Sequence, residues 1–159
     1  GEGMSSPLLH ELREQRALAY HVSASAEAMD MCGQFIIEAS MAPERFDECL
    51  QAVLALLTQH AERIDPQDLS RARRQLAVRR LRTLEKPLRQ IEDAALDLFA
   101  HGGVRTHDER LAALEGAGSE AVRGVFERLL GAGLSLALTG SVKRAAGQRA
   151  RDVLAAARP

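Results

Sequence analysis

Apolar and polar residues alternate in two short segments near the start of the chain. Every second residue from Leu18 to Ala24 is apolar or aromatic, and this spacing predicts a half-buried β-strand over residues 18–25. Residues 33–40 read Gly-Gln-Phe-Ile-Ile-Glu-Ala-Ser and are β-branched and aromatic enough to predict a second strand. Because only a short polar link separates the two segments, we expect them to form an antiparallel hairpin.

Apolar spacings of three and four residues dominate most of the remaining sequence and predict helices. Each helix begins at a recognisable signal, such as a hydroxyl or carboxylate cap or a proline in the first turn. The expected helices cover residues 6–16, a long segment from Pro43, residues 65–100 with a break or kink at Pro87, residues 106–115, residues 119–130, and an alanine-rich segment after Ser141. Between the last two, residues 134–139 alternate as a third strand would.

Three strands and five or six helices indicate an α+β fold. We expect a two-layer, helix-on-sheet domain with an early antiparallel hairpin, long helices and a late strand. A chain of 159 residues has the length of a single domain, so we assign residues 1–159 to one. Three strands are few for so many helices, so we also expect this domain to be a truncated portion of a larger α/β domain whose further strands precede Gly1.

Charge and composition exclude several classes of partner. The chain has 21 basic and 22 acidic side chains, so it has no overall positive field for nucleic acid or an anionic membrane. Four phenylalanines and one tyrosine offer few surfaces on which bases could stack. There is no apolar run of about 18 residues, so no membrane span is expected. Cys32 and Cys49 lack the spacing of a metal-binding or redox pair, which favours a reducing compartment. The sequence leaves open whether the two cysteines form one disulfide. It also leaves open whether the compartment is a bacterial cytoplasm or a periplasm.

The histidines do not form a zinc-binding motif. A helical zinc site needs two histidines four residues apart with a neighbouring glutamate, so that both imidazoles project from one face. The five histidines, at positions 10, 21, 60, 101 and 107, show no H-x-x-E-H or inverted H-x-x-x-H spacing. A nucleophile elbow and a phosphate-binding loop are also absent from the sequence. We therefore expect no metal site in this chain.

A basic segment crosses the middle of the chain. Residues 71–86 contain seven arginine or lysine side chains and a single acid, Glu85. Such a face can bind a polyanion. With so few aromatic residues, we interpret it instead as a solvated or interdomain face, balanced by acids in neighbouring helices, and expect no nucleic-acid binding.

Arg13 and Tyr20 form the most informative pair of residues. Arg13 is late in the first expected helix and Tyr20, the only tyrosine, is early in the first expected strand. A tight connection between these elements could direct a guanidinium and a phenol at one point, which suits a carbonyl oxygen that gains negative charge during peptide hydrolysis. Taken alone, the residues favour a surface ion pair of Arg13 and core packing of Tyr20 over such a site.

The same region resembles a known family of proteins. The resemblance rests on the run Gly1-x-Gly3-Met4-Ser5-Ser6-x-Leu8-x-x-Glu11-Leu12-Arg13-Glu14-x-Arg16-x-Leu18-Ala19-Tyr20-x-Val22, then Gly33-x-Phe35-x-Ile37-x-Ala39, Pro43-Glu44, Asp68-Leu69-x-Arg71-Ala72-x-x-x-Leu76, Leu84-Glu85 and the segment up to Gly140. It is similar to the glycine loop, helix and strand of the pitrilysin/insulinase family of zinc metallopeptidases. Nearly the whole chain is covered by this likeness.

The resemblance implies a non-catalytic domain that forms part of a substrate chamber. Zinc and the H-x-x-E-H motif would belong to a partner domain or subunit, and this chain alone would be inactive. Arg13 and Tyr20 would bind the substrate backbone beside the scissile carbonyl, and the backbone at Gly1 and Gly3 would contact the extended peptide. The sequence leaves open whether two copies of this chain form a homodimer.

Two alternatives to this reading remain. The first is a structural or assembly module of the same fold with no proteolytic role, and the second is an unrelated α+β binding module. Some residues also depart from the family pattern: Glu2 replaces a frequent glycine, and Ala17 and Ala19 replace a glycine-rich approach to Tyr20. Because alanine lacks the freedom of glycine at positive φ, a stiffer connection could change the direction of Tyr20.

Overall fold

The computed structural model describes residues 6–28, 33–141 and 144–156. The chain divides into two compact units, one made of Gly1–Arg63 together with Arg123–Pro159 and the other of Ile64–Val122. We call them unit 1 and unit 2 and describe each by itself. The expectation that residues 1–159 are one truncated domain stays a prediction.

Unit 1 begins with a short helical segment whose second half is a π-helix. Its first turn, α1, covers Pro7–Leu9, and the hydroxyl of Ser6 accepts a hydrogen bond of 3.3 Å from the backbone N–H of Leu9. The expected cap is therefore present. The π-helix, η1, covers His10–Gln15 and replaces the regular helix expected up to residue 16. A π-helix is rare outside short segments, which are frequent at functional sites.

The hairpin pairs β1, His21–Ala28, with β2, Gly33–Ser40, in antiparallel register. His21 lies opposite Ser40 and Val22 opposite Ala39. β2 has the expected bounds, and its side chains alternate between half-buried and exposed along the strand. β1 begins three residues later than expected, because the N–H groups of residues 18 and 19 bind the carbonyl of Leu12 and not a neighbouring strand.

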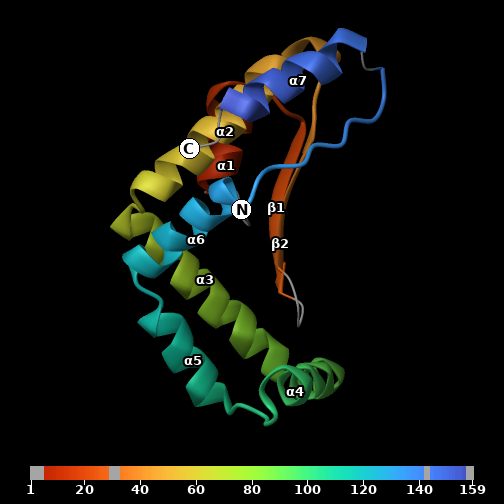
Figure 1. The fold of residues 1–159 in the computed structure, drawn as a ribbon. Helices are drawn as coiled ribbons and strands as arrows, with labels where there is room; N and C mark the ends of the chain where they lie inside the picture. The colour runs from red at the N-terminus through yellow and green to blue at the C-terminus, as the bar shows by residue number, and fades with distance from the viewer. Residues whose placement is uncertain (1–5, 29–32, 142–143, 157–159) are drawn as a thin grey trace. The chain divides into compact units, whose positions relative to one another are not determined.

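Helices pack on the hairpin to form the second layer (Figure 1). A 3₁₀ turn, η2, at Pro43–Arg45 leads into α2, Phe46–Glu62. Buried residues of α2 pack against the first helical segment and β1 in one core cluster, which comprises Leu12, Leu18, Ala19, Val22, Cys49 and Ala52. The predicted α+β, helix-on-sheet class is therefore confirmed for unit 1.

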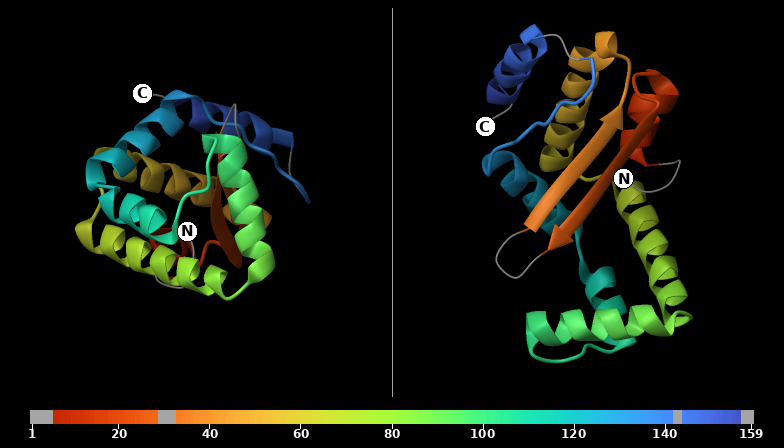
Figure 2. Two further views of the ribbon diagram at one scale, coloured as in Figure 1. Left: turned by 90° about the horizontal axis from the view of Figure 1, so that it is seen from below. Right: turned by 90° about the vertical axis from the view of Figure 1, so that its right-hand side faces the viewer.

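A second core cluster joins α2 to α7, Arg144–Ala156, which is nearly one hundred residues away in sequence. Ala150 is buried against Leu50 and Leu54, and the guanidinium of Arg149 lies 2.8 Å from a carboxylate oxygen of Asp47. The alanine-rich terminal helix was predicted, and its small side chains allow close approach to α2. The two helices lie side by side in both figures (Figure 2).

Residues 134–139 are extended but do not form the expected late strand. The sheet in the described residues has two strands only, β1 and β2. In the described part of the chain, no backbone hydrogen bond joins residues 134–139 to either strand. Leu134 instead contributes its side chain to the core cluster around Leu50. The alternation of apolar residues therefore does not correspond to one packed side, because Leu136 in the same segment is 41% exposed.

Helix α6, Ser119–Gly131, ends in unit 1 and supplies Phe126 to it. The ring of Phe126 lies 6.0 Å from that of Phe35 in an edge-to-face arrangement and 5.1 Å from that of His60. These contacts connect the hairpin, α2 and α6 through one aromatic side chain.

Unit 2 contains three helices, α3 at Pro66–Leu84, α4 at Pro87–His101 and α5 at His107–Gly116. The predicted break at Pro87 separates α3 from α4. Gly102 ends α4 in a left-handed conformation with φ 69°, which glycine adopts without steric cost. Thr106 and Glu109 form the predicted capping box of α5. In the described ranges, no helix combines the length and the apolar character that crossing a bilayer would require.

Candidate functional site

The segment between the first helix and β1 is a closed turn. The carbonyl oxygen of Leu12 accepts hydrogen bonds from the N–H of Leu18 at 2.7 Å and from that of Ala19 at 3.3 Å. Leu12, Leu18 and Ala19 are all buried. Arg13 directly follows Leu12 and Tyr20 directly follows Ala19, so the two candidate residues flank this backbone closure.

Two further contacts fix the turn in unit 1. The guanidinium of Arg45 donates a hydrogen bond of 3.1 Å to the carbonyl of Arg16, where the π-helix ends. The N–H of Tyr20 donates a hydrogen bond of 2.8 Å to the carbonyl of Ser40, at the end of β2. The turn is thus attached to both the hairpin and the start of the α2 segment.

Both candidate side chains point to solvent from this turn. The Arg13 side chain is half exposed, and its nearest charged partner is Glu14, at 3.8 Å. Tyr20 is 77% exposed. The core-packing alternative for Tyr20 is therefore wrong, whereas a surface ion pair of Arg13 is present. The exposed ion pair contributes little to stability, so Arg13 is available to another partner.

Ala17 carries the strain of the turn. Its φ of 48° is the single positive value among the non-glycine residues that the structure describes. This left-handed conformation costs an L-residue with a Cβ about 1 kcal/mol or more. The sequence thus has alanine where the backbone geometry favours glycine, and the packed Leu12 and Leu18 on either side hold it there.

We expect Ala17→Gly to raise the free energy of unfolding by about 0.5–1 kcal/mol, because relief of the left-handed strain outweighs the added freedom of glycine in the unfolded chain. The measurement is urea unfolding followed by circular dichroism. The matched control is Ala72→Gly at an exposed position inside α3, which should lower the free energy by about 1 kcal/mol. An equal loss for both variants would contradict the assigned strain.

The other residues proposed for this site have different outcomes. Gly1 and Gly3, the proposed contacts of the peptide backbone, lie outside the described residues. Ser6 caps the first helix, as predicted. His21 is exposed.

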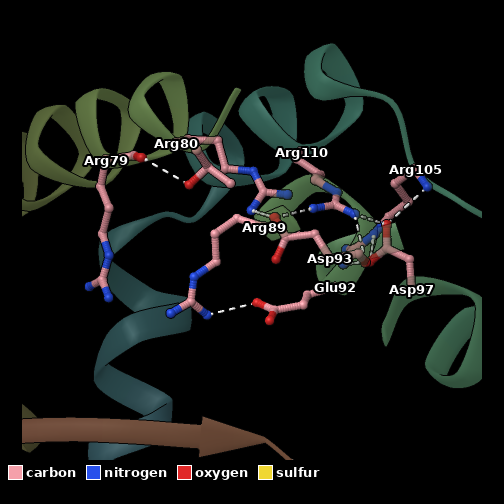
Figure 3. Close-up of polar contacts among 9 residues, drawn as sticks. Arg79, Arg80, Arg89, Glu92, Asp93, Asp97, Arg105 and Arg110 are labelled. Carbon is pink, nitrogen blue, oxygen red and sulfur yellow. Dashed lines mark hydrogen bonds and ion pairs between the residues drawn. The ribbon is translucent and has the colours of Figure 1, made fainter. Parts of the chain in front are cut away.

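A second polar region lies in unit 2, and the sequence did not single it out as a site. Two carboxylates on one face of α4, Asp93 and Asp97, bind three arginines from α3, from α5 and from the segment between α4 and α5 (Figure 3). Arg80 lies 2.7 Å from Asp93, and Arg105 lies 2.8 Å from Asp97. Arg110 contacts both carboxylates. The acids of α4 therefore balance part of the basic stripe, as predicted for neighbouring helices.

Asp97 is the most buried charge of this network, with only 4% of its surface exposed. Hydrogen bonds from the Arg105 side chain hold the pKa of the Asp97 carboxyl below its ordinary value, although burial acts in the opposite direction. The same pairing raises the pKa of Arg105. The pKa of Glu109 is lowered, first by the N–H of Thr106 and then by its hydroxyl. Both carboxyl groups therefore keep their charge to a lower pH than they would at their ordinary pKa.

Beside this network, an open hollow of about 820 Å³ lies between α3, α4 and α5. Its lining includes seven arginine or lysine side chains but only two carboxylates, those of Asp93 and Asp97. Leucines and an alanine form the apolar part of the lining. Charge and size together make the hollow a candidate binding site for an anion.

The chain is similar in sequence to one protein family and to several individual proteins. Residues 1–76 match the family described as "Peptidase M16 inactive domain". The mitochondrial-processing peptidase subunit alpha of Caenorhabditis elegans is 27% identical over 99% of this chain and 31% of its own length. An uncharacterized zinc protease of Streptomyces coelicolor is 29% identical over 98% of this chain and 34% of its own length. The predicted resemblance is confirmed.

The first 76 residues are similar to the non-catalytic, inactive-domain type of the pitrilysin/insulinase (M16) family of zinc metallopeptidases. An uncharacterized zinc protease of Rickettsia felis is also similar, with 29% identity over 64% of this chain and 25% of its own length. The chain spans about a third of the length of the first two relatives.

The family match covers the turn of Arg13 and Tyr20 and ends within α3. The hollow of unit 2 has most of its lining beyond residue 76. In the described part of this chain, histidine, cysteine, aspartate and glutamate side chains form no group of three or more that could hold a metal.

Proposed function

We propose that this chain is a non-catalytic, chamber-forming domain of a zinc-dependent metalloendopeptidase, and that it binds the backbone of a peptide which a zinc-bearing partner half hydrolyses. The match to an inactive M16 domain and the similarity to two zinc proteases support this proposal. The partner half is a fused domain or a separate subunit. In this proposal the metal and the general base belong to that partner.

The observation that carries the proposal is the closed turn at Leu12. Its carbonyl binds the N–H groups of Leu18 and Ala19, so Arg13 and Tyr20 leave one small region of backbone and both reach solvent. A guanidinium and a phenol are both strong hydrogen-bond donors. Donors that are fixed before the reaction stabilise an oxygen that gains negative charge more than they stabilise the neutral carbonyl.

The roles of the two residues follow from this chemistry. Arg13 donates to a backbone carbonyl of the bound peptide, and Tyr20 donates to the oxygen of the scissile carbonyl as charge develops on it. Giving up the 3.8 Å contact with Glu14 costs Arg13 little, since exposed ion pairs contribute at most about 1 kcal/mol. Both residues act by binding and orienting, and neither needs to transfer a proton.

The test uses the full-length protein or this chain combined with its zinc-bearing subunit, and measures cleavage of a fluorogenic peptide. Tyr20→Phe should lower kcat/KM by about 100-fold, the usual effect of losing one donor to a developing oxyanion, and Arg13→Ala should lower kcat/KM chiefly by raising KM, because Arg13 binds the peptide backbone. Tyr20→Phe should act mainly on kcat, because it removes only the hydroxyl.

Matched controls separate this role from general damage. Arg16→Ala removes an arginine three residues from Arg13 that is bound to Glu11, and His21→Ala changes the exposed neighbour of Tyr20. Both should leave kcat/KM within about twofold, as expected for surface substitutions. Cleavage that Arg13→Ala and Tyr20→Phe leave unchanged would support the alternative function, a structural or assembly module without a proteolytic role.

A further inference from the structure

Six of the seven cations around the hollow of unit 2 fall into two groups. Arg80, Arg105 and Arg110 are bound by Asp93 and Asp97 (Figure 3). These three hold the helices of unit 2 together. They are therefore poor candidates for binding an external ligand.

The second group lies where α3 meets α4 and consists of Arg82, Lys86 and Arg89. All three are exposed. Among the described residues, no carboxylate lies within ion-pair distance of Arg82 or Lys86. Arg89 has one partner, Glu92 at 2.9 Å, in an exposed pair that a ligand can displace at little cost. Arg82 and Lys86 therefore give this corner of the hollow positive charge that no described carboxylate balances within ion-pair distance.

The rest of the lining restricts the kind of anion. Leu76, Leu96, Leu111 and Leu114 line the hollow, and no aromatic side chain does. A nucleic acid would find no aromatic surface for base stacking. An acidic peptide suits both parts, because carboxylates pair with arginine in a bidentate geometry and aliphatic side chains pack on leucine. The volume, about 820 Å³, is that of a pocket for several residues and exceeds the space one small anion fills.

We propose that the hollow between α3, α4 and α5 binds an acidic peptide segment, whose carboxylates pair with Arg82, Lys86 and Arg89 and whose aliphatic side chains lie on the leucines. This binding does not depend on the roles proposed for Arg13 and Tyr20, because every residue of the hollow lies in unit 2.

The test measures binding of a fluorescein-labelled peptide, Asp-Glu-Leu-Asp-Glu-Leu, to the full chain by fluorescence anisotropy. The R82E/K86E/R89E variant should weaken binding by about 10- to 30-fold, and the neutral variant R82Q/K86Q/R89Q by about half as much on a logarithmic scale. The control R63E/R128E/R151E reverses three exposed arginines outside the hollow and makes the same change in net charge. It should change binding by less than about threefold, since distant exposed charges are screened.

The results of this experiment distinguish an acidic-peptide site from non-specific charge attraction and from a nucleic-acid site. Binding that also requires the acidic side chains, and is therefore lost for the amide peptide Asn-Gln-Leu-Asn-Gln-Leu, supports the proposal. Equal weakening by the hollow and control variants would overturn it. A single-stranded oligonucleotide that displaces the peptide at a lower concentration than the unlabelled peptide does would also overturn it. Because no cleavage is measured, the result stands whether or not the chain serves a peptidase.

Discussion

Replacing Leu12 with alanine is expected to lower the free energy of unfolding by about 3–4 kcal/mol. Leu12 has no exposed surface, and it lies at the centre of the first core cluster of unit 1. Removal of a buried leucine side chain costs the lost transfer free energy and adds the cost of a cavity. Leu12 also supplies the carbonyl that closes the turn of Arg13 and Tyr20, so the cavity opens directly beneath the candidate site.

The measurement is urea unfolding by circular dichroism, with linear extrapolation to water. Tyr20 is the only tyrosine and the chain contains no tryptophan, so tyrosine fluorescence reports on the turn itself. The control Leu136→Ala makes the same chemical change at a position that is 41% exposed, and should cost less than about 1 kcal/mol. Similar losses for the two variants would show that the core of unit 1 is not centred on Leu12.

Replacing Asp97 with asparagine is expected to lower the Tm of unit 2 by roughly 10 °C at neutral pH. The substitution keeps the shape of the side chain and removes its charge. It thereby leaves Arg105 and the largely buried Arg110 without their shared partner. Breaking a buried pair by removing one partner is strongly destabilising, and a chain of this size loses a few degrees of Tm per kcal/mol.

The stabilising effect of the Asp97 charge depends on pH, and the direction of this dependence follows from the lowered pKa of Asp97. The pKa of Asp97 is lower in the folded chain than its ordinary value, so its stabilising effect is complete above that ordinary value and is lost as the pH falls through the folded pKa. The advantage of the native chain over Asp97→Asn should therefore shrink below about pH 4. Asp152→Asn, at an exposed site on α7, is the control and should have little effect at any pH. A difference in Tm that is independent of pH would contradict the role assigned to the charge.

Local signals in the sequence predicted most of the helices and the hairpin. Ser6, Asp65 and Thr106 cap helices because each side chain acts within three residues of itself, and Pro87 breaks a helix for an equally local reason. The strand β2 could be predicted with its bounds because the alternation of its residues matches its burial. The π-helix could not be predicted from the sequence, because its extra residue per turn depends on the packing of Leu12 and on the closure of the turn at Leu18.

The predictions that failed concern partners distant in sequence. Residues 134–139 have the pattern of a strand, but a strand needs a neighbour, and no pattern within six residues specifies one. Arg13 and Tyr20 could be singled out because a family motif contains them. The hollow of unit 2 could not be singled out from the sequence. It depends on which arginines of α3 face Asp93 and Asp97, and the charges along a single helix do not reveal which of them do.

The two units of the fold also differ in when they can be completed during synthesis. Residues 64–122 are continuous in sequence, so all the partners of α3, α4 and α5 have left the ribosome together. Unit 1 instead needs α7, whose Ala150 packs on Leu50 and Leu54 across about one hundred residues. Until residues 144–156 emerge, α2 exposes that apolar face. The nascent chain is therefore prone to aggregation in the interval between the synthesis of α2 and that of α7.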